Sequence, residues 1–294
     1  MIIVESASIS DKGKKRAANE DALILEDALG LYVVADGMGG HRAGDIASRL
    51  VVETIGEYIK NAIENDDCDQ TADFDETLSR EANRLLSSIR MANQVVHAAS
   101  LKNSSCRGMG STVSAIYFTE STLIAANVGD SPIYLIRGGK IKLLSVPHTF
   151  IEEQKTLNPE NAEKLGMEFR HVLTRAVGTE KSVIADIYEI QCFRDDILVI
   201  SSDGLNDKVS SEEILELVYN DGPDAACQKL VNLANDRGGD DNITVIVLKV
   251  KLVKNSPHRI NRFLALVKRN SFRILARTKI NLMLKYPRVA KCRT

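Results

Sequence analysis

The 294-residue chain lacks the long hydrophobic runs that would place it in a membrane. No window gives the roughly 18 uninterrupted apolar residues of a spanning helix. The opening residues MIIVESASISDKGKK contain no basic segment followed by an apolar run, which an export signal would have. We therefore expect a cytoplasmic protein, with the inner face of the membrane as an alternative location.

Cysteine pairs that could form cross-links or zinc sites are also lacking. The five cysteines are widely spaced and include no C-x-x-C pair. An odd number without paired spacing favours free thiols over a disulfide framework or a zinc site. Two nucleophile signatures are missing as well, since the chain has no G-x-S-x-G turn and no C-x₅-R phosphate loop.

Acidic residues are absent from one part of the chain. Residues 251–294 contain 13 Lys or Arg and no Asp or Glu. Removing them from the whole chain's 38 basic and 40 acidic residues leaves 25 against 40, a formal charge of −15 for residues 1–250. This contrast predicts a domain over 1–250 and a separate basic tail over 251–294. An acidic body disfavours nucleic acid as a partner and suits a protein that gathers metal cations.

The remaining pattern predicts an α+β fold. Short β-rich runs separated by turn residues favour antiparallel pairing, and their grouping between helical segments favours two packed sheets flanked by helices. Between these elements we expect a loop over 61–75 and an irregular excursion with one short helix over 147–166. The expected strands lie at 2–9, 22–25, 31–35, 112–118, 122–128, 132–136, 184–190, 197–201 and 243–250, and the expected helices at about 44–60, 74–102, 210–219 and 223–236.

Acidic residues recur where the expected strands begin or end. They are Glu20 with Asp21, Asp36, Asp130, Asp203, and Asp240 with Asp241. At two of these places an apolar strand runs into Asp-Gly, and glycine would let the backbone turn so that its carbonyl approaches an ion. One Asp-Gly is more often an ordinary turn. Five acidic strand ends in one domain instead predict an oxygen-lined site for Mg²⁺ or Mn²⁺.

The segments around these carboxylates resemble the metal-dependent serine/threonine protein phosphatases of the phosphatase 2C type, particularly their bacterial branch. The resemblance covers about residues 1–250 and implies a central sandwich of two antiparallel sheets with helices on both outer faces. In chain order the segments are RAANED (16–21), VVADGMGGHRAGDIAS (33–48), MGST (109–112), NVGDSPIY (127–134), LTRAVG (173–178), SSDGLND (201–207) and DDNITVIVL (240–248).

The resemblance implies a role for each carboxylate at the two main metal sites. Asp36 looks like the ligand that bridges two ions, with Asp203 and Asp241 completing one site and the Gly37 carbonyl contributing to the other. The implied cofactor is Mn²⁺ or Mg²⁺, two per active site. The implied reaction is hydrolysis of phosphoserine and phosphothreonine in proteins by a metal-activated water at a two- or three-metal site, opposing a serine/threonine kinase.

The resemblance also implies supporting residues. Glu20 and Asp21 would act largely through metal-bound waters, and Asp130 together with Asp203 would hold a third, weaker ion. Arg16 resembles the arginine that grips the substrate phosphate, to which its planar fork of donors is suited. His41 or a metal-bound water would protonate the leaving group, although a lone histidine before a helix is more often structural.

Two positions depart from part of the family. Some members carry a histidine directly after Asp-Gly, where this chain has Met38. In Pro147-His148-Thr149 many relatives have an acid before the histidine; this region resembles the variable flap beside the cleft, so the departure bears on substrate access. Arg175 could reach substrate or form a structural salt bridge.

The basic tail lies beyond the resemblance. Ser256-Pro257 resembles a helix start, and apolar residues of 260–275 share one face opposite arginines, which predicts a basic amphipathic helix. It could dock on an anionic membrane surface or an acidic partner, or simply pack on the domain. A binding protein without turnover is the alternative function, but Asp36, Asp203 and Asp241 are all present, which disfavours it.

Overall fold

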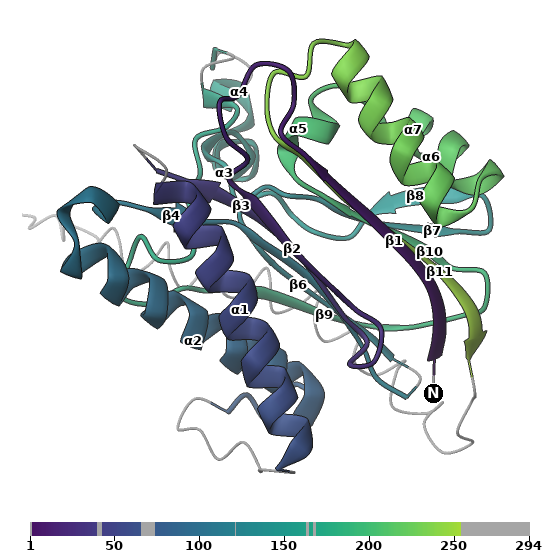
Figure 1. The fold of residues 1–294 in the computed structure, drawn as a ribbon, viewed down its shortest axis with the longest axis horizontal. Coiled ribbons are helices and arrows are strands. Elements are labelled where there is room, and N and C mark those ends of the chain that lie inside the picture. The colour runs from purple at the N-terminus through teal and green to yellow at the C-terminus, as the bar shows by residue number, and fades with distance from the viewer. Residues whose placement is uncertain are drawn as a thin grey trace, which may run out of the picture. The chain divides into compact units, whose positions relative to one another are not determined.

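Two antiparallel sheets face each other in the computed structural model (Figure 1), which describes residues 2–39, 43–65, 74–120, 122–162, 165–166 and 169–253. These residues belong to one compact unit, Met1–Lys254. His41 and the predicted tail helix lie outside the described residues.

Every neighbouring pair of strands in the two sheets is antiparallel. The first sheet has the order β1 (Ile2–Asp11), β11 (Ile243–Val253), β10 (Ile197–Ser201), β7 (Ile133–Arg137) and β8 (Lys140–Leu143). The second has the order β2 (Asp21–Glu26), β3 (Leu31–Met38), β5 (Val113–Phe118), β6 (Thr122–Val128) and β9 (Asp186–Gln191), with β4 (Gly110–Ser111) paired to the end of β3.

Alternate residues of β3 belong to two different cores. Tyr32 and Val34 face the first sheet and pack in one buried cluster with Leu198 and Ile246. Leu31, Val33 and Ala35 belong to a second cluster, which packs under the helices of the other face. A strand buried on both sides reads as a continuous apolar run, as Leu31 to Ala35 does.

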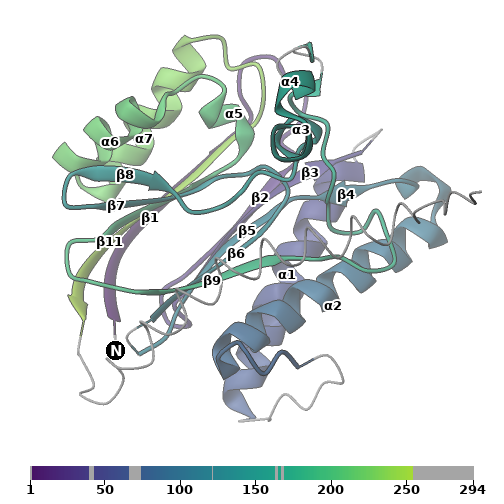
Figure 2. The ribbon, with the colours of Figure 1, turned by 180° about the vertical axis from the view of Figure 1, so that it is seen from behind.

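Helices cover both outer faces (Figures 1 and 2). On the second sheet lie α1 (Ala43–Glu64) and α2 (Arg80–Lys102), which buries Leu85, Ile89 and Val96 as its spacing predicts. On the first sheet lie α6 (Ser211–Asn220) and α7 (Pro223–Asp236). The predicted sandwich flanked by helices on both faces is therefore confirmed.

Several predicted boundaries are wrong by a few residues. Helix α2 begins at Arg80 and not near Phe74, because the side chain of Ser79 caps it by accepting the Ala82 N–H. The excursion after β8 holds two short helices, α3 (Phe150–Leu157) and α4 (Pro159–Ala162), where one was predicted. Asn158 separates them because the residue before a proline is disfavoured in helical conformation. The last strand continues past the predicted end, with Ile2 paired to Val253.

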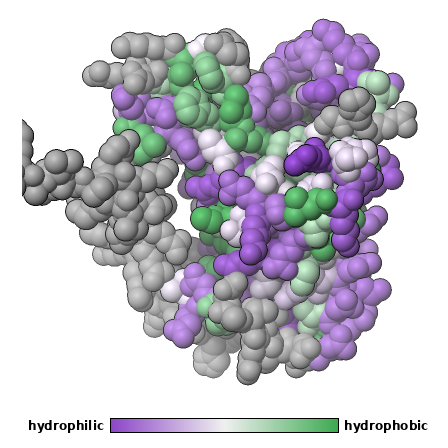
Figure 3. All heavy atoms as spheres, turned by 90° about the vertical axis from the view of Figure 1, so that its left-hand side faces the viewer, coloured by the Kyte–Doolittle hydropathy of each residue, from purple (hydrophilic) through white to green (hydrophobic). Residues whose placement is uncertain are grey.

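Some large hydrophobic side chains of the described residues are exposed. On the face drawn in Figure 3, hydrophilic residues cover most of the coloured surface and hydrophobic residues form separate groups. Among the helices that the structure describes, none is both long and apolar enough to cross a bilayer.

The strand registers bring the predicted acidic residues to one end of the sandwich. Asp21 at the start of β2 lies opposite Asp36 near the end of β3. The end of β1 lies opposite the start of β11, and Ser201 at the end of β10 lies opposite Val245. In the second sheet the end of β6 lies opposite the start of β5. The residues that follow β6 and β10 therefore lie at the same end of the sandwich as the residues that precede β2 and β11.

The two Asp-Gly glycines allow close packing of the backbone. A Cβ added to Gly37 would lie 2.1 Å from the Gly44 carbonyl oxygen, and one added to Gly204 would lie 2.1 Å from the Asn242 carbonyl oxygen. Neither has a positive φ. At both positions it is therefore a neighbouring segment, and not a left-handed backbone conformation, that excludes a side chain.

We expect Gly204→Ala to destabilise the domain, because its Cβ would force α5 (Asp203–Asn206) and the segment before β11 apart. Overpacking of this severity costs about 3 kcal/mol, which lowers the thermal unfolding midpoint of a domain of this size by roughly 6–12 °C. Gly222→Ala is the control, since nothing lies within 4 Å of its added Cβ, and replacement of this N-cap glycine of α7 should cost at most about 1 kcal/mol. Equal midpoints for the two variants, measured by circular dichroism, would contradict the packing argument.

Candidate metal centre

A cleft of about 790 Å³ opens at this end of the sandwich. Separate strand ends supply its acidic lining, and Arg16 and Gly37 also face it. Asp21 lies behind the lining and is buried. The structure thus brings together all the predicted site residues that it describes: Arg16, Glu20, Asp21, Asp36, Gly37, Asp130, Asp203 and Asp241. His41, as noted, is not among the described residues.

The carboxyl groups of Asp21 and Asp36 have raised pKa values because they are buried close to other carboxyl groups. Their backbones are direct partners in the β2–β3 ladder. Burial raises the pKa of Asp21 to about 7, although a hydrogen bond from Ser202 Oγ to Asp21 Oδ2 (2.8 Å) opposes the rise. Burial, together with repulsion from Asp21, Asp203 and Asp130, raises the pKa of Asp36 well above its ordinary value. Ionised, these carboxylates need a positive charge beside them.

A further observation shows that a cation fits. Asp21 Oδ1 is buried and has no hydrogen-bond partner among the described residues, an expensive state for a carboxylate oxygen unless an ion or ordered water meets it. The carboxylates beside it offer oxygen atoms, which suit Mg²⁺ and Mn²⁺. When bound, divalent ions would offset the carboxylate charge and activate water as a nucleophile.

Asp130 and Asp241 also line the cleft, but they lie in different electrostatic environments. Burial, followed by repulsion from Asp203, raises the pKa of Asp130 to about 7. Asp241 is instead paired with Arg16, whose Nη2 donates to Asp241 Oδ2 at 2.6 Å. The Arg16 side chain is 53% exposed, so its guanidinium lies at the rim, where a solvent-borne anion can reach it.

Buried hydroxyls fix the positions of Asp36 and Asp130. Thr112 Oγ1 accepts the Asp36 N–H at 2.9 Å and bonds to Ser131 Oγ at 2.8 Å. Ser131 follows Asp130 directly, so one hydroxyl pair connects both turns. Sequence reasoning missed this role, although both residues lie within the segments MGST and NVGDSPIY.

Asn242 performs a similar task for the loop before β2. Its Oδ1 accepts the Glu20 N–H (2.8 Å), and its Nδ2 donates to the carbonyls of Lys12 (2.8 Å) and Ala18 (2.9 Å). The loop that carries Arg16 is therefore held against the residue next to Asp241.

The segment 147–175 between β8 and β9, which we call the flap, is joined to this site. Buried His148 accepts the Gly129 N–H through Nδ1 (3.1 Å), and Gly129 precedes Asp130. The Nε2 atom of His148 lies 3.2 Å from Asp186 Oδ2. Arg175 lines the cleft and donates to Asp186 Oδ1 at 3.1 Å, so of its two predicted roles the salt bridge is present.

His171 of the flap also lines the cleft, although the sequence analysis did not predict it as a site residue. Its Nδ1 lies 3.4 Å from Asp203 Oδ2 and its Nε2 lies 3.4 Å from Asp207 Oδ2. The contact with Asp203 raises the pKa of His171 to about 9. The sequence offered no signal beyond a lone histidine in an irregular segment.

Comparisons with known proteins agree with this geometry. Residues 12–243 match the family model described as Protein phosphatase 2C. A putative protein phosphatase 2C-type of Streptococcus pyogenes is 34% identical over 245 residues, which are 81% of this chain and 94% of that protein. Protein phosphatase PhpP of Streptococcus pneumoniae is 30% identical over 255 residues, which are 84% of this chain and 98% of that protein.

Solved structures are similar as well. The crystal structure of the Mycobacterium tuberculosis serine/threonine phosphatase PstP/Ppp has a TM-score of 0.73 and 30% identity, covering 86% of this chain and 100% of that one. The catalytic domain of PstP in complex with two manganese ions has a TM-score of 0.69 and 29% identity, with the same coverage of each chain.

We expect Asp36→Asn to raise the stability of the metal-free protein while abolishing its stabilisation by Mn²⁺. The change removes a carboxyl group whose burial beside other carboxylates is unfavourable, and relief of about 1 kcal/mol raises the unfolding midpoint of such a domain by roughly 2–4 °C. Thermal unfolding in chelator and in Mn²⁺ measures both effects. Asp195→Asn is the control, because that carboxylate is 74% exposed and its φ of 68° also suits asparagine. A metal-free Asp36→Asn protein that unfolds below wild type would refute the repulsion.

Proposed function

The chain belongs to the protein phosphatase 2C family, and from this premise we propose that Asp36, Asp203 and Asp241 hold the catalytic metal ions and that Arg16 binds the substrate phosphate beside them. The protein is a metal-dependent serine/threonine phosphatase that hydrolyses phosphoserine and phosphothreonine in proteins with Mn²⁺ or Mg²⁺. The observation that supports these roles is the meeting of carboxylates from separate strand ends in one cleft with an arginine at its rim.

Arg16 is suited to a phosphate by position and by chemistry. Its bond to Asp241 uses one of five N–H donors and sets the direction of the guanidinium plane. A planar fork of donors matches the oxygens of a phosphate dianion better than an ammonium does. We therefore assign Arg16 to substrate binding and to neutralising charge that develops on the phosphoryl oxygens.

The remaining carboxylates have supporting roles in this proposal. Glu20 and Asp21 act through waters of the metal shell, in keeping with the unpartnered Oδ1 of Asp21. The Gly37 carbonyl would help to hold the main ion that Asp203 and Asp241 do not complete, and Asp130 with Asp203 would hold a third ion. His41 as proton donor to the leaving alkoxide stays a prediction from the sequence.

We further propose that the partner of this enzyme is the serine/threonine kinase whose products it reverses, because the reaction consumes phosphoserine and phosphothreonine in proteins. The division into a catalytic domain over 1–250 and a basic tail over 251–294 is also a proposal. It rests on the confinement of 13 Lys or Arg and no acid to the last 44 residues.

We expect Asp203→Asn to lower turnover of a phosphothreonine peptide at saturating Mn²⁺ by at least about 100-fold, because the ions lose a shared ligand. Arg16→Ala should lower kcat/KM by about 10- to 100-fold, the loss for charge-assisted hydrogen bonds of about 1.5–3 kcal/mol. Arg194→Ala is the control for a lost surface arginine, being 74% exposed. Full activity in folded Asp203→Asn protein would refute the metal assignment, and wild-type kcat/KM in Arg16→Ala would refute the phosphate assignment.

For the tail, we propose docking on an anionic membrane surface, with an acidic protein as the alternative. Removal of residues 255–294 leaves β11 whole, because that strand ends at Val253. We expect the shortened protein to lose sedimentation with phosphatidylserine vesicles while peptide turnover is unchanged. Raised turnover would indicate that the tail inhibits the enzyme, and retained sedimentation would refute membrane docking by the tail.

A further inference from the structure

His171 is placed beside the proposed third metal position by contacts on the flap itself. The Phe150 N–H donates to the Val172 carbonyl (2.8 Å), and the rings of Phe150 and Phe169 lie 5.7 Å apart. The turn that carries His171 is thus fixed to the start of α3 on both sides of the histidine.

The same framework holds Asp130. The His148 N–H donates to the Gly129 carbonyl (2.9 Å), and the Thr174 N–H donates to the His148 carbonyl (2.9 Å). Through His148, the stem of the flap is bonded to the residue before Asp130. The positions of Asp130 and His171 therefore depend on one connected set of hydrogen bonds.

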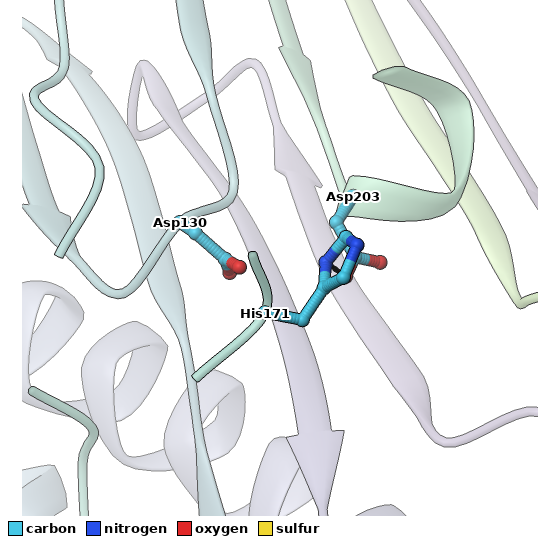
Figure 4. A group of neighbouring side chains, drawn as sticks. All are labelled: Asp130, His171 and Asp203. Atoms are coloured by element: carbon cyan, nitrogen blue, oxygen red, sulfur yellow. Dashed lines mark ion pairs between the residues drawn. The ribbon is translucent and has the colours of Figure 1, made fainter. Parts of the chain in front are cut away.

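Three potential ligand atoms converge as a result. One oxygen each of Asp130 and Asp203 and one ring nitrogen of His171 all lie within 4.8 Å of one another. Figure 4 shows the His171 ring, from the flap, beside the Asp203 side chain at the start of α5, while the Asp130 carboxylate, from the loop after β6, points toward them from the other side. A single ion can contact all three after small side-chain movements.

The second nitrogen of His171 gives an independent indication. Its Nε2 lies 3.4 Å from Asp207 Oδ2, on the side away from the Nδ1 contact with Asp203. Histidines that bind metals almost always present their other ring N–H to a carboxylate or carbonyl, which orients the ring and strengthens the ligand. Asp207, His171 and an ion beside Asp203 would form such a carboxylate–histidine–metal series.

We propose that His171 is a ligand of the third metal ion and that its imidazole makes this site prefer Mn²⁺ over Mg²⁺. The inference rests on the proposed function through Asp130 and Asp203. Oxygen ligands alone accept either ion, whereas imidazole favours first-row transition metals. The flap would thereby contribute a ligand atom to the metal centre.

The test is Mn²⁺ binding by the full chain, followed by pulsed electron paramagnetic resonance with ¹⁵N-labelled histidine. Wild-type protein should bind a third equivalent of Mn²⁺ that shows nitrogen coupling from histidine and resists displacement by excess Mg²⁺. His171→Asn should keep the two tight ions but bind the third at least about 10-fold more weakly, without that coupling. His97→Asn, on α2, controls for the loss of a histidine that bonds to a backbone carbonyl and is not among the three candidate ligands, and it should bind the third ion as wild type does.

Asp207→Asn provides a second test that leaves His171 in place. It should weaken the third ion about 10-fold and retain the nitrogen coupling. Three Mn²⁺ ions bound with unchanged coupling in His171→Asn would overturn the inference, and His171 would then serve only as a counter-charge to Asp203 and Asp207. Absence of tight Mn²⁺ in wild type would instead be a failure of the proposed function, so the two failures are distinguishable.

Discussion

The register of β2 against β3 is the constraint on which the site depends. It places Asp21 and Asp36 directly opposite each other in an antiparallel ladder, where two like charges destabilise a sheet. The sheet keeps this pairing because Leu23, Leu25, Tyr32 and Val34 place their apolar side chains in the core between the sheets. A shift by one residue would relieve the repulsion, but it would also turn that apolar face away from the core. Hydrophobic burial thus keeps the Asp21 and Asp36 carboxylates opposite each other, and a bound cation can reduce their repulsion.

The neighbouring polar groups limit how the carboxylates can respond to this conflict. Thr112 and Ser131 hold the backbones of the Asp36 and Asp130 turns, and Asn242 holds the strand entry at Glu20. Because these bonds are made to backbone groups or neighbouring residues, the acidic side chains cannot simply separate. These hydrogen bonds fix the backbone that carries the ligands, which lowers the cost of ordering them when an ion binds.

Much of the fold, and most of the residues that meet at the candidate site, were predictable from the sequence. Apolar runs that end in acidic residues, such as LYVVA before Asp36, mark strand ends, and the ordered segments resembled one family. The start of α2 was misplaced because Leu78 continues the apolar spacing ahead of the Ser79 cap. The edge strand Lys140–Leu143 was missed because it is only four residues long and mostly exposed. The packing role of Gly204 and the approach of His171 to Asp203 depend on segments far apart in the chain, which local patterns do not encode.

The pairing of β1 with β11 joins the first and last strands of the described unit. Arg16 and Asp241, 225 residues apart, meet only after this pairing forms. Contacts of such long separation form after local structure, since the chain must first close a large loop. A nascent chain on the ribosome therefore has no complete catalytic centre until the segment of Asp241 and β11 has emerged. The enzyme therefore cannot act on phosphoproteins before β11 has been made and has paired with β1.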